Sequence, residues 1–157
     1  MTIRLTSETF KPNQPVPVRH TEDGEDVSPP LQWAGAPAET RQFALIMDDP
    51  DAPRPEPWVH WVIYGIPAEV AALPPGVPRS ERLAEPAGAL QGKNTWGESG
   101  YRGPAPPRGH GRHRYHFRLY ALDEALELAP GLEKGELLDA IEGHVLDEGE
   151  LVGSYRR

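Results

Sequence analysis

The sequence predicts a mainly β fold, and three observations favour it. Its 19 prolines and 16 glycines are spread over 157 residues and interrupted by apolar runs, which is typical of a loop-rich β protein and not of a disordered chain. Two short runs are apolar on both strand parities, and a third alternates between apolar and polar side chains. Because a chain of this length suits a single core, we expect one domain over residues 1–157.

The apolar runs predict the centre of a sheet. Residues 43–47 and 61–66 present apolar side chains to both faces, as strands that are covered on both sides do. Residues 115–121 alternate instead, with apolar side chains at the odd positions and His116 and Arg118 between them. This strand is therefore expected to have one face in the core and one wetter face.

Outside these strands the sequence predicts one helix, one more strand and one long loop. Apolar residues recur at helical spacing between residues 136 and 146, which predicts a short amphipathic helix, and a last strand is expected over residues 150–155. Residues 73–92 carry scattered apolar side chains among Pro, Gly, Ala and charges. We expect this segment to be a long surface excursion within the domain.

Composition narrows the class of partner. A net charge of −8 disfavours nucleic acid, because the phosphates would be repelled over most of the surface. Cysteine is absent, so neither disulfides nor thiol chemistry is expected. The first ten residues contain no apolar run, and nowhere do eighteen apolar residues follow one another, so we expect neither a secretion signal nor a transmembrane segment, and a cytoplasmic location. The acidic segment 20–26 is expected to be a solvated loop.

Two polar stretches about fifty residues apart contain the candidate functional residues. The first is Asp49-Pro50-Asp51-Ala52-Pro53, which leads to His60, and the second is residues 109–115, which include His113 and Tyr115. Each places acid or imidazole groups where a turn rich in Pro or Gly meets an expected strand. If the two stretches meet in the fold, they would form a small polar pocket with stiff walls.

Strand parity gives these residues a predicted direction. His113 shares parity with Tyr115, and Asp49 continues the odd-numbered row of residues 43–47. His60 shares parity with the even-numbered residues Val62, Tyr64 and Ile66. Rows of this kind that end at one edge of the core predict a binding site. Imidazole and phenol groups donate hydrogen bonds to phosphate or carboxylate oxygens, and a neighbouring carboxylate orients an imidazole.

Five ordered segments carry a family resemblance. They are SPPLQW at residues 28–33, DDPDAP at 48–53, WVHW at 58–61, GYRGP at 100–104 and GHGRHRYHFRLYAL at 109–122. Together they resemble the phosphatidylethanolamine-binding protein family, and within it the bacterial Raf-kinase-inhibitor-like branch. The ordered matches run from about residue 28 to the end of the chain, and five segments in order are far more specific than any one of them.

The resemblance implies a compact fold with a large central antiparallel sheet, a smaller sheet packed on it and a short helix near the C-terminus. It also implies an anion pocket, whose ligand-binding residues fall on Asp49, Asp51, Pro53, Trp58, His60, Gly103, Ala105, Pro106, His113 and Tyr115. Ala105 departs from the glycine of animal relatives, which would narrow the pocket slightly. Kinase inhibition does not transfer with the fold, because the C-terminal extension of the animal proteins has no clear counterpart here.

These observations predict a small-ligand-binding protein, not an enzyme, with a pocket for a phosphate or phosphoethanolamine-like group and a possible regulatory or inhibitor-like role. His60, His113 and Tyr115 are expected to donate to the anion, and Asp49 and Asp51 to orient the imidazoles. Neither a cofactor nor a metal is expected, a homodimer is favoured slightly as the commonest symmetric state, and any protein partner is left open.

Competing interpretations stay open. An acid–base phosphoester hydrolase would use His60 and His113, but no obvious nucleophile or metal cage accompanies them. A metal site on the same two histidines, and a protein-interaction module that does not use the pocket, are further alternatives. The structural interpretation is that both histidines are only hydrogen-bonded residues at the edge of the core.

Overall fold

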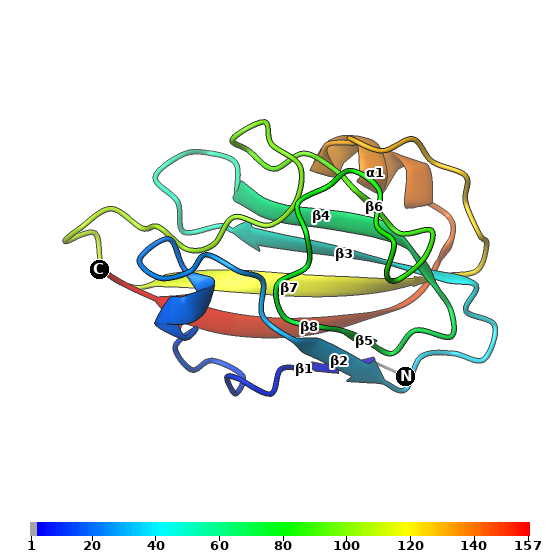
Figure 1. The fold of residues 1–157 in the computed structure, drawn as a ribbon, viewed down its shortest axis with the longest axis horizontal. Coiled ribbons are helices and arrows are strands. Elements are labelled where there is room, and N and C mark those ends of the chain that lie inside the picture. Colours follow the sequence, from blue (N-terminus) through cyan, green and yellow to red (C-terminus); the bar gives the residue numbers. More distant parts are fainter. Residues whose placement is uncertain (1–2) are drawn as a thin grey trace.

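The computed structural model describes residues 3–157 and contains two antiparallel sheets (Figure 1). The larger sheet has the order β6-β4-β3-β7-β8. Its strands are Leu90–Gln91, Trp58–Pro67, Gln42–Asp49, His113–Leu122 and Val145–Tyr155. The smaller sheet has the order β1-β2-β5, with strands Arg4–Thr6, Leu31–Ala34 and Ala72–Leu73. The predicted mainly β fold, with a large central sheet and a smaller one, is confirmed.

The large sheet is covered on both faces. The small sheet packs Leu5, Leu31 and Trp33 against one face, in a core cluster that also contains Phe43 and Phe117. The other face is covered by the helix α1, which spans Lys134–Ile141, and a single turn of 3-10 helix lies at Val18–His20. Figure 1 shows α1 and the small sheet on opposite sides of the large sheet. The fully apolar run of β3 follows from this burial on both faces.

Strand β4 contains an irregularity that decides where one histidine points. Met47 pairs with Trp61 and the next residue, Asp48, pairs with Val59, so His60 is an extra residue in its strand. At such a bulge two successive side chains of the longer strand point to nearly the same side. His60 therefore lies on the face of Trp61, toward the small sheet, while Val62 packs under α1. The predicted parity of His60 with Val62 and Tyr64 is wrong for this reason.

The C-terminal boundary between helix and strand also differs from the prediction. Helix α1 begins with a capping box between Glu133 and Glu136 and ends at Ile141, five residues before the predicted end. Gly143 follows with a φ of 84°, a left-handed conformation that turns the chain out of the helix. Val145, which has helical spacing in the sequence, instead begins β8, so this strand is longer than the predicted residues 150–155.

Residues 73–92 pack into the main core and are not the surface excursion that the sequence predicts. Short strands stand at its two ends, and its interior buries Val77, Leu83 and Ala89 against the main core. Within residues 3–157, no helix has the length and apolar character needed to cross a membrane.

Candidate functional site

A cavity of about 320 Å³ lies where β3 ends and β4 and β7 begin. Eight of the ten predicted site residues line it, and we call it the His60–His113 cavity. Its lining consists of Glu22, Asp49, Ala52, Pro53, Trp58, His60, Trp96, Ala105, Pro106, Pro107, His113 and Tyr115. Asp51 and Gly103 do not belong to this lining.

A buried pair of His113 and Asp49 joins the two polar stretches of the sequence. The Nδ1 atom of His113 lies 2.6 Å from Oδ2 of Asp49, and both side chains are at most 5% exposed. Because a carboxylate only accepts, Nδ1 carries the hydrogen and donates it to Asp49. The contact fixes the ring and leaves Nε2 as the second functional nitrogen of His113.

His60 has a different partner and therefore a different role. Its Nδ1 lies 2.6 Å from the carbonyl oxygen of Arg102, which can only accept a hydrogen bond. Burial lowers the pKa of His60 from 6.5 to about 4, so the ring is neutral near pH 7. With the hydrogen on Nδ1, Nε2 is an acceptor. His60 thus offers an acceptor near neutral pH, in place of the donor that the sequence predicts.

The ring of Tyr115 lies near both imidazoles. Its ring lies edge-on to His60 at 5.3 Å and stacks with His113 at 6.4 Å between ring centroids. Burial, with a smaller contribution from the Asp49 carboxylate, raises the pKa of Tyr115 well above its usual range, so the hydroxyl keeps its proton. Tyr115 lines the cavity, and a hydroxyl that keeps its proton can donate a hydrogen bond.

Asp51 does not orient an imidazole, contrary to the prediction. Its carboxylate accepts hydrogen bonds from the backbone N–H of Arg114 at 2.8 Å and from the guanidinium of the same residue at 2.9 and 3.0 Å. These bonds lower the pKa of Asp51 to about 2. The backbone N–H of Asp51 in turn donates to Asp49 Oδ1 at 2.8 Å. Asp51 therefore ties the turn after β3 to the start of β7.

Gly103 is needed for close packing and not for the cavity wall. A Cβ atom at this position would lie 2.1 Å from the carbonyl oxygen of His20, and the backbone N–H of Gly103 donates to Asp26 Oδ1 at 2.7 Å. Only glycine lets the two backbone segments approach this closely. Its effect on the cavity is indirect, through the position of the neighbouring residues.

The acidic segment 20–26 is part of the site, although a solvated loop is expected from its composition. His20 is 1% exposed and hydrogen-bonds the carbonyl oxygen of Val27 at 3.0 Å. Glu22 lines the cavity, and its Oε1 atom accepts from Arg102 Nη2 at 3.0 Å. Sequence reasoning missed Glu22, because its place depends on a long-range contact that no local pattern reveals.

Two tryptophans form an aromatic wall of the cavity. The rings of Trp58 and Trp96 meet edge to face at 5.3 Å. The guanidinium of Arg54 lies 5.1 Å from the Trp58 ring, and that of Arg102 lies 4.5 Å from the Trp96 ring. Cations at these distances stabilise the rings through cation–π attraction. Of these two tryptophans, only Trp58 is among the predicted pocket residues.

The lining has a distinctive balance of charge. Glu22 and Asp49 contribute two carboxylates, whereas no Lys or Arg appears in the lining among the described residues. Over the part of the chain that the structure describes, no three His, Cys, Asp or Glu side chains are grouped so as to hold a metal ion. The cavity can donate through Tyr115 and accept through His60 and the carboxylates. Nε2 of His113 donates when this ring is an imidazolium, with a hydrogen on both nitrogens.

The fold and this cavity define a two-sheet protein with paired imidazoles at one end of its core, and comparison with known proteins identifies the class. Residues 6–156 match the family model described as "Phosphatidylethanolamine-binding protein". The chain belongs to this family, as the ordered sequence segments predict.

Similar proteins occur in both archaea and bacteria. A "UPF0098 protein" of Methanothermobacter thermautotrophicus is 51% identical, over 99% of both chains. Among solved structures, a putative phosphatidylethanolamine-binding protein homologue from Chlamydia trachomatis is 36% identical, with a TM-score of 0.89 over 99% of this chain and 98% of that one. YbcL of E. coli, described as a new member of the mammalian family, is 29% identical, with a TM-score of 0.92 over 100% and 99% of the two chains.

Proposed function

We propose that the protein binds a small ligand through a phosphate or phosphoethanolamine-like group in the His60–His113 cavity, and that it acts as a regulatory or inhibitor-like binding protein. The observation that carries the proposal is the buried His113 ring, held by Asp49 at 2.6 Å and stacked on Tyr115. A volume of about 320 Å³ suits a small molecule or a headgroup.

The polar atoms of the site match a phosphate monoester that keeps one proton. With His113 as an imidazolium paired with Asp49, its Nε2 and the hydroxyl of Tyr115 would donate to the charged oxygens of the ligand. His60 Nε2, an acceptor near neutral pH because the pKa of this ring is about 4, would receive the remaining P–O–H hydrogen. Hydrogen bonds to a charged group are the stronger kind, so His113 and Tyr115 would contribute most of the affinity.

The carboxylates favour a ligand that also carries a cation. Glu22 Oε1 accepts a hydrogen bond from Arg102, but its second oxygen, Oε2, is buried and has no hydrogen-bond partner among the described residues. An ammonium group near this oxygen would gain a charge-assisted hydrogen bond that inorganic phosphate cannot make. The site therefore suits phosphoethanolamine-like ligands better than inorganic phosphate.

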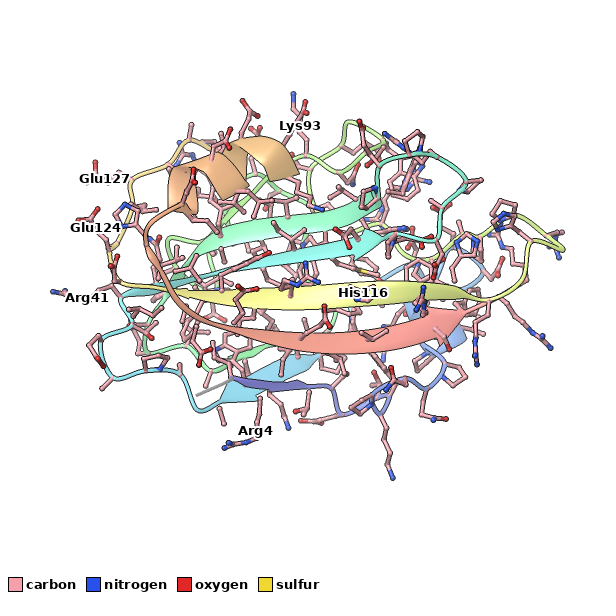
Figure 2. The ribbon with its side chains drawn as sticks, turned by 180° about the vertical axis from the view of Figure 1, so that it is seen from behind. Arg4, Arg41, Lys93, His116, Glu124 and Glu127 are labelled. Atoms are coloured by element: carbon pink, nitrogen blue, oxygen red, sulfur yellow. The ribbon has the colours of Figure 1, made fainter. Side chains whose placement is uncertain are left out.

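The test compares the wild type with Tyr115→Phe by titration calorimetry against O-phosphoethanolamine and inorganic phosphate. Loss of one hydrogen bond to a charged oxygen should raise Kd about 10- to 150-fold while the ring packing is kept. His116→Ala serves as the control, because His116 contacts Glu150 on the face of β7 that carries α1, away from the cavity (Figure 2). The control should bind like the wild type. Equal binding by wild type and Tyr115→Phe would contradict the proposal.

The same proteins distinguish binding from catalysis. A binding protein should leave a chromogenic phosphoester intact, and O-phosphoethanolamine should only raise its thermal midpoint. Turnover that is lost in His60→Gln would instead support acid–base hydrolysis by His60 and His113. A cytoplasmic location, a homodimer and one domain over residues 1–157 stay predictions.

A further inference from the structure

A second imidazole occupies the nitrogen of His113 that the proposed ligand needs. Nδ1 of His110 lies 2.6 Å from Nε2 of His113, with the ring centroids 4.8 Å apart. His113 is buried, whereas His110 is exposed and lies in the loop that leads into β7. His110 is not one of the residues that line the cavity, so it contacts His113 from the rim.

Nε2 of His113 can form a hydrogen bond with His110 or with a ligand, but not with both at once. Nδ1 of His113 already donates to Asp49, so Nε2 is the ring nitrogen that can contact a ligand. One hydrogen fits between Nδ1 of His110 and Nε2 of His113, and either ring can carry it. In both cases Nε2 is occupied and cannot donate to an incoming anion at the same time.

We infer that His110 is an affinity-determining residue of this site, which competes with the anionic ligand for His113. The inference rests on the proposed function. An anion that reaches His113 must first displace His110, so the free energy of the contact between the two imidazoles is subtracted from the free energy of ligand binding.

The loop that carries His110 has few contacts that would oppose this displacement. Residues 107–112 are all exposed, and a single hydrogen bond from the His110 N–H to the Pro107 carbonyl, at 3.1 Å, closes the turn. A Cβ atom added at Gly109 or Gly111 would meet no atom within 4 Å, so neither residue packs against the body of the protein. Segments with little packing open at low cost in free energy.

Several charged residues lie near the contact between His110 and His113. Asp49 faces His113 from the end of β3. Arg112 and Arg108 are exposed in the same loop, and Arg114 is engaged by Asp51. None of these groups makes a hydrogen bond to His110 among the described residues. The contact with His113 is thus the main side-chain interaction of His110 to be removed by mutation.

The experiment measures Kd for inorganic phosphate and for O-phosphoethanolamine in the wild type, His110→Ala and the control His116→Ala. Removing the competitor should tighten binding of both probes about 3- to 10-fold, the range that one net hydrogen bond gives. His116→Ala removes an imidazole from strand β7, outside the loop of His110, and should leave both Kd values unchanged. Circular dichroism and the thermal midpoint verify that His110→Ala is folded, which its exposed position predicts.

Each other outcome overturns the inference in a recognisable way. Weaker binding by His110→Ala would mean that His110 contacts the ligand. Equal binding by His110→Ala and the wild type would mean that the contact does not limit access to His113, and would leave the proposed function standing. Binding by neither protein would overturn the proposed function together with the inference.

Discussion

His60 and His113 line the same cavity but are held in opposite ways. His113 shares a hydrogen with the carboxylate of Asp49, and His60 donates to the neutral carbonyl of Arg102. The first ring has a buried counter-ion, whereas the second has none and is kept neutral by burial, with a pKa of about 4. Two identical residue types in one cavity can therefore serve as donor and acceptor, because only the ring beside a carboxylate has a counter-ion for the second hydrogen that a donating Nε2 needs.

The largest expected effect comes from removing the counter-ion. In Asp49→Ala the buried His113 loses its carboxylate and the N–H of Asp51 loses its acceptor. The free energy of unfolding should fall by about 3–5 kcal/mol, as it does when one partner of a buried pair is removed. Urea denaturation measures this change. A loss below about 1 kcal/mol would show that the pair contributes little and that the contrast between the two histidines is smaller than the structure indicates.

His60 should produce the next largest effect, through pH. Its pKa is about 4 in the folded protein against 6.5 in the unfolded chain, because burial disfavours the charged ring. The unfolded state therefore takes up a proton first as the pH falls. The contribution of His60 to stability is complete above pH 6.5 and is lost between pH 6.5 and 4, by about 3 kcal/mol in total.

The matched variant for this effect is His60→Gln, whose amide can still donate to the Arg102 carbonyl but does not titrate. Between about pH 7 and about pH 4.5, the free energy of unfolding measured by urea denaturation should fall less in the variant than in the wild type. The lowered pKa of buried His20 acts in the same direction in both proteins, so the difference between them isolates His60. Identical pH dependence in the two proteins would show that His60 is not held neutral.

Asp51 should give the smallest effect, which sharpens the contrast with Asp49 two residues away. Its bonds to Arg114 lie at the surface, where solvent screens them. Asp51→Asn should lower the free energy of unfolding by no more than about 1 kcal/mol and should leave phosphate binding nearly unchanged. If ligand affinity fell as much as in Asp49→Ala, Asp51 would have a direct role in the site.

The sequence predicts the His113 half of the cavity better than the His60 half. Strands β3 and β7 pair without a register shift from Gln42 to Asp48, so alternation places Asp49, His113 and Tyr115 on one face as expected. In β4 the extra residue at the bulge reverses that rule for His60. Bulges are set by the partner strand, and no pattern within residues 58–67 reveals one.

Sequence periodicity also does not predict the short strands and the loops. Strands β1, β2, β5 and β6 are two to four residues long, too short to show a period. Glu22 and His110 reach the site through loops, where contacts depend on the whole fold. The family resemblance supplies the two-sheet architecture that periodicity alone does not.

The aromatic wall gives the molecule a built-in optical reporter. Trp58 and Trp96 line the cavity, each with a guanidinium against its ring, whereas Trp33 and Trp61 are at most 6% exposed in the core. A ligand that enters the cavity changes the surroundings of only the first pair. The emission of the core pair then stays constant, and occupancy can be followed by intrinsic fluorescence without any attached label.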